Sequence, residues 1–432
     1  LITSFIRTGT NKNKHHLNKR EMCGLHGTIR GTLFCSRVMG LLPLTGLTSP
    51  TSVKLRFTLR SPYTIFYAIS LFGQVLMFIM TVYWLITNGI SLANISNSIF
   101  YTSSLISFLI LMLIGRSWPT LVSKVEAIES RLPPFTRNVG AMSNVTTIFI
   151  LVAAIVEHLL SVFYGLKVAC ACDMNNVAEN YFHFNMPWIF DYTPYAVWKG
   201  VLSELFNIQS TFIWSLNDLL IMVISIYLTE HFLIHNELLK KAVEQVLCYV
   251  RNIIRNIIVQ SISVSLSTHF KKTEHFSCHE FRTQYLKIVR LVKLINGQFG
   301  IYILTSFGSN LYWICTQLFY SLSRTQTGHF ITCKFMDSDT LNGVEHSIYF
   351  TYSFSFLLLR TLFVLLLAAR IHSNSVAPLY VLYGIPSARF HVERFIAQIN
   401  NLKVAMSGLD FFYVTRTMIL TVSMVKENIT LK

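Results

Sequence analysis

The sequence predicts an all-α polytopic membrane protein with seven transmembrane helices and a cytoplasmic N-terminus. Of its 432 residues, 52% are hydrophobic and only 13% are charged, and the mean hydropathy is +0.49. This balance is unlike that of a soluble domain. The apolar residues fall in runs long enough to cross a bilayer. The basic residues gather in alternate loops between these runs, which sets the predicted orientation.

The chain begins with a basic segment, 1–62, that holds ten Lys and Arg against a single acidic residue, Glu21. None of its apolar runs is long enough to span a membrane. The run LLPLTGL at 41–47 is too short and too late for a signal peptide. We therefore expect 1–62 to form a cytoplasmic N-terminal tail.

Six spans follow and form a predicted six-helix membrane domain over 63–370. Each is an apolar stretch close to the ~20 residues that a membrane helix needs. The predicted spans are Tyr63–Thr87, Ser98–Gly115, Val145–Val168, Leu205–Leu228, Gln298–Leu322 and His346–Ala369.

The loop charges orient these spans. The N-terminal segment and the connectors after spans two and four hold ten, four and ten Lys and Arg. The loops after spans one, three and five hold none, one and two. Because positively charged loops stay in the cytoplasm, the N-terminus lies inside and the C-terminus outside. The long connector 229–297 is then cytoplasmic, and the glycosylation sequon at Asn94 lies in an outer loop.

The region 371–425 is predicted to hold an anchor helix and a seventh span. Pro378 and Pro386 interrupt the backbone after span six. Apolar residues then recur at i, i+3, i+4 and i+7, the pattern of an amphipathic helix that ends at Gly408. The last apolar run, Phe411–Val425, contains Arg416 as its only charge. A pore-lining element can show this arrangement, and so can a plain last membrane helix packed against its neighbours.

Strongly polar side chains inside the spans are candidates for ligand binding. A charged side chain there costs at least ~2.5 kcal/mol on insertion scales, so it needs a partner or a water-filled cavity. The polar set is Glu157, His158, Asn217, Asp218, Asn310 and Arg360.

Two interpretations of this set remain open. In the first, a shared cavity suits a polyol and is lined by Glu157, His158, Trp214, Asp218 and Asn310. Trp214, Tyr312 or Trp313 would then stack on the C–H faces of a sugar. In the second, Glu157 pairs with Arg360, or Asp218 with His158, and the pairs only hold helices together.

The eight cysteines divide by side of the membrane. Cys170, Cys172 and Cys333 lie in outer loops, so a disulfide between Cys333 and one of the other two is a candidate, with one thiol left over. The cysteines of the cytoplasmic stretches should be reduced, and Cys315 lies within a span, where it packs against its neighbours.

Several function classes are excluded by what the sequence lacks. It has no HExxH, CxxC, P-loop or Rossmann glycine signature, and no nucleophile elbow. We therefore expect no enzyme activity, no cofactor and no metal site. The net charge of +16 is scattered over loops and does not indicate nucleic-acid binding.

The C-terminal stretch SARFHVERFIAQINNLKVAMSGLDFFYVTRTMILTV resembles the signature of insect gustatory receptors, and its FF-x-VTR-x-x-IL form is similar to their sugar-receptor branch. The stretches WSLNDLLIMVISIYL, EFRTQYLKIVRLVKLINGQFGIYILTSFGSNLYWICTQLFYSL and IYFTYSFSFLLLRTLFVLLLAARIHSNSVAPLYVLYGIPS resemble the same branch. The resemblance covers roughly residues 60–425 and is most specific over the last hundred.

This resemblance implies a seven-helix receptor that assembles as a homo- or hetero-tetramer with related subunits around one central pore. A sugar in an outward-facing pocket would open the pore to cations, in the plasma membrane of taste-neuron dendrites. The last helix of each subunit would line the pore with Phe411, Phe412, Arg416, Thr417 and Leu420. A receptor of the same fold for another tastant or an odorant is the alternative. A secondary transporter fits less well, because the sequence shows no repeated halves.

Two stretches depart from the family pattern. The family's last helix continues into Thr-Tyr-Glu-x-Val-Leu-x-Gln-Phe, whereas here KENITLK occupies 426–432. Residues 252–276 also look foreign to the connector. Both resemble translated non-coding sequence, so we expect the pore helix to be truncated and its C-terminal end to be aberrant.

Overall fold

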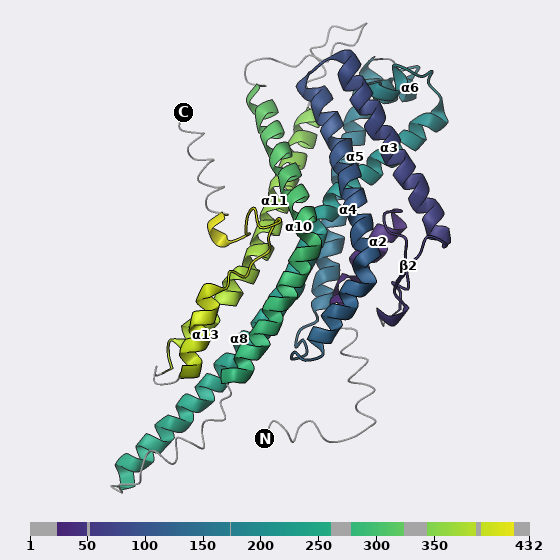
Figure 1. Cartoon of the computed structure of the whole chain (residues 1–432). Helices are drawn as coiled ribbons and strands as arrows, with labels where there is room; N and C mark the ends of the chain where they lie inside the picture. The colour runs from purple at the N-terminus through teal and green to yellow at the C-terminus, as the bar shows by residue number, and fades with distance from the viewer. Residues whose placement is uncertain are drawn as a thin grey trace.

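The structure is a computed structural model that describes residues 24–49, 52–172, 174–260, 278–323, 344–385 and 390–418. Within these ranges, six helices are long and apolar enough to cross a membrane. They form an elongated bundle (Figure 1) and confirm the six predicted spans, each extended at its ends. Their bounds are α3 Pro62–Asn88, α4 Leu92–Glu129, α5 Val139–Cys172, α8 Val197–Gln260, α10 Cys278–Ser323 and α11 Val344–Val376.

Helix α8 is the axis of the bundle. In its most apolar stretch 83% of the residues are buried, against 22–50% in the other five long helices. It packs against α2, α4, α5, α10 and α11. A helix that is apolar on nearly every face must be covered on nearly every face, so side chains from α8 meet those of most other helices in the interior.

The N-terminal segment contributes to the core. Helix α2, Leu25–Val38, buries Leu25, Ile29 and Leu33 at i, i+4 and i+8, and it packs on α5 and α8. A short hairpin follows, in which β1, Leu44–Thr45, pairs antiparallel with β2, Arg56–Phe57, around the 3-10 turn η2, Ser52–Lys54. The described part of 1–62 is therefore a packed element and not a free tail, because an amphipathic face too short to span a membrane can still cover a bundle.

The outer connections are more helical than expected. Helix α4 begins at Leu92, with Ser91 as its N-cap accepting from the Asn94 backbone N–H at 3.1 Å. Asn94 therefore lies in a helix and not in the predicted loop, and its side chain accepts from Trp84 Nε1 at 3.1 Å. The loop after α5 contains the short helices α6, Val177–Asn185, and α7, Pro187–Phe190.

The predicted connector 229–297 is largely helix. Helix α8 continues to Gln260 and α10 begins at Cys278, and the end of α8 projects beyond the other helices (Figure 1). Before that projecting end, the aromatic rings of Phe232, Tyr285 and Phe395 pack together, with centroids 6.0 and 5.5 Å apart. Of the stretch 252–276, the first nine residues belong to α8 and the others lie outside the described ranges.

The end of the chain differs from the prediction in two ways. After the five-residue α12, Pro378–Leu382, the amphipathic helix α13 spans Phe390–Asn401 and ends well before Gly408. Phe411 does not begin a helix, since helical backbone resumes only at Arg416. The reason is a turn in which Ser407 Oγ accepts from the Asp410 N–H at 2.7 Å and donates to its carboxylate at 3.0 Å. Residues 419–432, with the predicted truncation, lie outside the described ranges.

Candidate functional site

A buried ion pair joins the central helix to α11. Arg360 Nε lies 2.8 Å from Asp218 Oδ2, and both side chains are 0% exposed. Arg360 Nη1 also donates to Ser215 Oγ at 3.0 Å. The other carboxylate oxygen of Asp218 accepts from Ser306 Oγ at 2.6 Å and Asn310 Nδ2 at 2.8 Å, both on α10. One carboxylate thus ties α8, α10 and α11 together.

Aromatic rings enclose the guanidinium. Arg360 Cζ lies 4.2 Å from the centroid of the Trp214 ring and 5.1 Å from that of Phe356, so the cation rests on π faces as well as on a carboxylate. Trp214 Nε1 donates to Asn310 Oδ1 at 3.1 Å. The Trp313 ring lies 5.7 Å from the Trp214 ring. Every strong charge at this level is paired.

A second polar layer lies two helical turns away on the same helix faces. Glu157 Oε1, on α5, accepts from Ser353 Oγ at 2.6 Å, and Ser353 Oγ accepts from Gln317 Nε2 at 3.3 Å. Ser353 precedes Arg360 by seven residues on α11, and Gln317 follows Asn310 by seven on α10, so each pair shares a face.

We call the two layers together the interior polar column. Its members are Glu157, Trp214, Ser215, Asp218, Ser306, Asn310, Trp313, Gln317, Ser353 and Arg360.

Several buried atoms of the column have no hydrogen-bond partner among the described residues. They are Glu157 Oε2, Trp313 Nε1, Gln317 Oε1 and Arg360 Nη2. Each unsatisfied buried group costs about 1–3 kcal/mol, so these atoms require a partner such as a bound water or a ligand hydroxyl. Two of the four atoms, Glu157 Oε2 and Gln317 Oε1, lie in the Glu157 layer. A third, Trp313 Nε1, lies beside that layer. The open hydrogen-bonding capacity is therefore concentrated at that layer.

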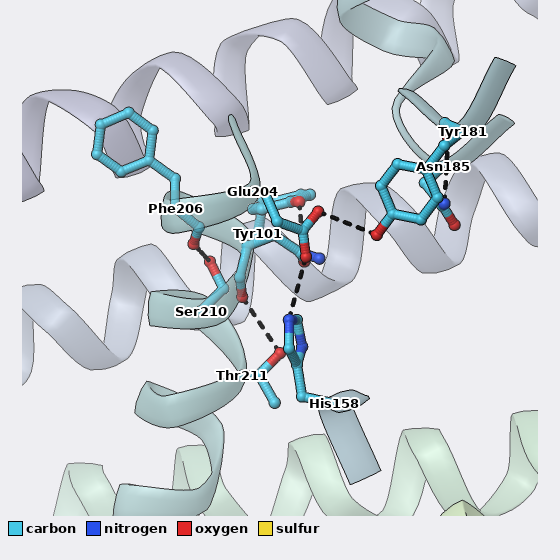
Figure 2. A network of polar contacts seen from close by, with 9 residues as sticks. Tyr101, His158, Tyr181, Asn185, Glu204, Phe206, Ser210 and Thr211 are labelled. Atoms are coloured by element: carbon cyan, nitrogen blue, oxygen red, sulfur yellow. Dashed lines mark hydrogen bonds and ion pairs between the residues drawn. The ribbon is translucent and has the colours of Figure 1, made fainter. Parts of the chain in front are cut away.

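His158 lies in a different network. Figure 2 shows Glu204, near the start of α8, between the His158 ring and the Tyr181 hydroxyl. His158 Nε2 lies 3.1 Å from Glu204 Oε1, and Tyr181 donates to Glu204 Oε2 at 3.4 Å. Neighbouring residues of a helix point about 100° apart, which turns His158 away from Glu157 and from the column.

The structure therefore corrects both predicted pairings. Asp218 pairs with Arg360 and not with His158, and Glu157 bonds to Ser353 and not to Arg360. Of the proposed shared set, Trp214, Asp218 and Asn310 come together, with Glu157 in the adjacent layer and His158 outside.

The remaining predicted side chains lie at the edge of the column. The Tyr312 hydroxyl is 2.9 Å from Ser96 Oγ on α4, and its ring meets Trp313 edge-on with centroids 5.4 Å apart. Asn217 Nδ2 donates to Ser107 Oγ at 2.8 Å, which links α8 to α4. Tyr312 and Trp313 together form an aromatic wall between α4 and α10.

The chain matches the profile of the trehalose receptor family over residues 7–258 and 258–426. It belongs to the trehalose receptor family. This confirms the resemblance to the sugar branch of the insect gustatory receptors, whose members are receptors and not enzymes.

Two related receptors match the chain over most of its length. It is 26% identical over 406 residues to the Drosophila melanogaster gustatory receptor for sugar taste 64f, covering 92% of this chain and 78% of that protein. It is 26% identical over 422 residues to the Drosophila melanogaster gustatory receptor 5a for trehalose, covering 96% and 84%.

Among solved structures, the insect olfactory receptor OR5 from Machilis hrabei is similar, with a TM-score of 0.60 at 12% identity over 94% of this chain and 97% of that one. The same receptor in complex with eugenol gives a TM-score of 0.58 at 15% identity, covering 93% and 96%. The trehalose receptor family member described here therefore has the olfactory receptor fold.

The predicted pore residues of this gustatory receptor are only partly described. Phe412 packs on Phe307 of α10, with centroids 5.3 Å apart. Phe411 is 79% exposed, Arg416 and Thr417 are also exposed on the single chain, and Leu420 lies outside the described ranges. Their role in a pore stays a prediction.

The cysteine prediction is likewise untested. Cys170 is half-buried and free within the described ranges, while the Cys172 side chain and Cys333 lie outside them. The described part of the chain contains no group of three or more His, Cys, Asp or Glu side chains that would hold a metal ion.

Sequence reasoning missed five partners of the receptor's polar residues: Glu204, Ser215, Ser306, Gln317 and Ser353. A single serine in a span carries no signal, because it is common there. One pattern was available, since residues 306, 310, 313 and 317 of α10 follow i, i+4, i+7 and i+11 and so share one face.

Proposed function

We propose that this chain is a subunit of a sugar-gated cation channel and that the sugar binds at the Glu157 layer of the interior polar column. The observation that carries the proposal is the set of buried, unpartnered polar atoms beside two tryptophan rings. The relatives named for sugar taste and for trehalose support a sugar as the ligand.

The chemistry of this layer suits a polyol. Sugar hydroxyls donate to Glu157 Oε2 and Gln317 Oε1, and a sugar oxygen accepts from Trp313 Nε1. The indole faces of Trp214 and Trp313 stack on the C–H faces of the ring. Asp218 and Arg360 are already paired, so they act as positioning residues that set the angle between α8, α10 and α11.

The contacts of α10 offer a route from ligand to pore. One face of α10 carries Asn310 and Trp313, while Phe307 on another face packs against Phe412. A Cβ added at Gly300 would lie 3.1 Å from Leu409 Cδ2, so backbone and side chains are in close contact where the last segment begins. A ligand that shifts α10 therefore shifts the start of the pore segment.

We also propose how the receptor assembles and how it lies in the membrane. The N-terminus lies in the cytoplasm, and four identical or related subunits surround a pore lined by Phe411, Phe412, Arg416, Thr417 and Leu420. The 79% exposure of Phe411 supports a contact with a neighbouring subunit. The receptor works in the plasma membrane of taste-neuron dendrites, as a multi-pass protein.

The test uses Trp313→Phe, which keeps an aromatic ring but removes the indole N–H together with part of the bicyclic ring. We expect the half-maximal sugar concentration for evoked current to rise roughly three- to tenfold, as loss of one hydrogen bond predicts. Trp188→Phe is the matched control, because Trp188 Nε1 is also buried and unpartnered within the described residues but belongs to the outer α7 cluster.

Equal dose–response curves for parent, Trp313→Phe and Trp188→Phe would exclude the Glu157 layer as the sugar site. Current evoked by eugenol and not by any sugar would favour the odorant alternative. Uptake of radiolabelled sugar without current would favour a transporter.

A further inference from the structure

A cavity of about 320 Å³ opens between α5, α8 and α11, and none of its lining residues belongs to the interior polar column. Its polar residues are Arg137, Thr146, Thr229, Glu230 and Arg370. Glu230 follows Asp218 by twelve residues on α8, and Arg370 follows Arg360 by ten on α11, so the charged end of the cavity lies roughly 15–18 Å farther along the helices. It is at the basic end of the bundle, where the N-terminal segment and the connector after α4 lie.

The charges of the cavity favour an anion. The lining contains two guanidiniums and one carboxylate. Arg137 Nε lies 4.0 Å from Glu230 Oε1, and the Arg137 side chain is 65% exposed while that of Glu230 is 5% exposed. One of the two positive charges is thus offset by Glu230, and one has no counter-charge among the described residues that line the cavity.

A buried hydroxyl adds a directed polar group. Thr229 lines the cavity and is 4% exposed. Its Oγ1 has no hydrogen-bond partner among the described residues. A buried hydroxyl without a partner is costly, so Thr229 Oγ1 is suited to donate to an acceptor held between the two arginines.

The rest of the wall is apolar and continues onto the outer surface. Val145 and Phe149 of α5 and Phe363 of α11 line the cavity and are 67%, 61% and 46% exposed. Exposed apolar side chains at membrane depth face lipid chains or another protein. A cavity with cations at one end and an apolar wall open to the surface matches an amphiphile and not a small soluble anion.

We propose that this cavity binds an anionic phospholipid of the leaflet at the basic end of the bundle, which is the cytoplasmic leaflet in the orientation given above. The phosphodiester lies between Arg137 and Arg370 and accepts a hydrogen bond from Thr229. An acyl chain runs along Phe149 and Phe363. The inference does not depend on the sugar function.

The test measures lipid retention by the full-length receptor. Protein extracted from vesicles of phosphatidylcholine with phosphatidylglycerol is analysed by native mass spectrometry, which counts phospholipids per chain. We expect the parent to retain phosphatidylglycerol in preference to phosphatidylcholine. The Arg137→Gln/Arg370→Gln variant should retain it roughly tenfold less, because charge-assisted contacts to phosphate are lost. Arg116→Gln removes a single charge at an exposed arginine of α4 outside the cavity and is the control for loss of a surface arginine.

A second variant separates a lipid from a free phosphate. Leu367→Trp places a larger side chain in the apolar wall and so narrows the cavity. It leaves both arginines in place, and it should also lower phosphatidylglycerol retention. Added inorganic phosphate should not compete.

Three outcomes would overturn the proposal: equal retention in parent and double variant, an equal loss in Arg116→Gln, or full competition by inorganic phosphate. Disulfide-linked dimers of a Phe149→Cys variant, absent from the parent, would overturn it as well, because a second copy would then cover this face.

Discussion

The ion pair between Asp218 and Arg360 is predicted to be the most sensitive polar contact of the receptor. Asp218→Asn keeps the shape of the side chain and its hydrogen-bond acceptor for Ser306, but it removes the charge that faces Arg360 at 2.8 Å. Since both side chains are 0% exposed, the guanidinium loses its counter-charge in a fully buried site. Leaving one charge of a buried pair uncompensated costs about 3–5 kcal/mol.

A double-mutant cycle can separate the cost of the unpaired charge from the general effect of a mutation at this position. Asp218→Asn/Arg360→Met removes both charges and keeps an unbranched apolar stem against Trp214. Because replacing both partners of a buried pair is close to neutral, we expect the double variant to recover most of the loss. Glu237→Gln is the control on the same helix. Its pair with Lys241 at 2.6 Å is exposed, so no measurable change is expected.

The assay is the free energy of unfolding from denaturant titration of the purified receptor in detergent, supported by the amount at the cell surface. A total stability of about 5–15 kcal/mol means that the single variant should lose a large share of its free energy of unfolding. An Asp218→Asn variant as stable as the parent would refute the reasoning. So would a double variant less stable than either single variant, because the cost would then not come from the unpaired charge.

Three further regions of the molecule allow direct tests. Gly73→Ala should lower surface expression, because a Cβ there would lie 2.0 Å from Phe206 Cε1, whereas Gly308→Ala, which meets nothing within 4 Å, should not. Burial lowers the pKa of His26 below its ordinary value, so the unfolded chain takes up the proton first. Stability should therefore fall as the pH drops below about 6.5, and His26→Gln should reduce that slope in melting experiments. If Thr417 lines the pore, Thr417→Cys should make sugar-evoked current sensitive to a charged thiol reagent, and an insensitive variant would place Thr417 elsewhere.

The six membrane helices were predictable because a bilayer imposes both length and composition on a span. Their ends were not. Hydropathy marks the part of a helix that lies in lipid, while the helix itself continues wherever its backbone bonds are satisfied and one face stays packed. Helix α8 therefore extends from the predicted end at Leu228 to Gln260, with Leu239 and Val243 still buried and Lys240 and Lys241 exposed.

The packing of α2 shows a second limit of sequence reasoning. With 14 residues, polar side chains among them, it is too short to cross a bilayer, so length and composition favour a tail. Yet Leu25, Ile29 and Leu33 are nearly inaccessible. Thr32 Oγ1 meets Thr147 Oγ1 of α5 at 2.9 Å. Whether such a helix docks depends on a complementary groove elsewhere in the chain, which no local pattern reports.

For the candidate site, too, the type of a residue was predictable from the sequence and its contacts were not. The cost of a charge in the membrane identified Glu157, Asp218 and Arg360 as residues that need partners. Which partner each one has depends on the rotation and depth of whole helices, since a shift of one residue turns a side chain by about 100°. Asp218 and Arg360 neutralise each other's charge and fix the arrangement of the helices that carry them. Glu157 is left with an unpaired oxygen within the described residues. That remaining demand for a hydrogen bond, together with the absence of a charged partner among the described residues, is why we propose Glu157 as the ligand contact and Asp218 and Arg360 as positioning residues.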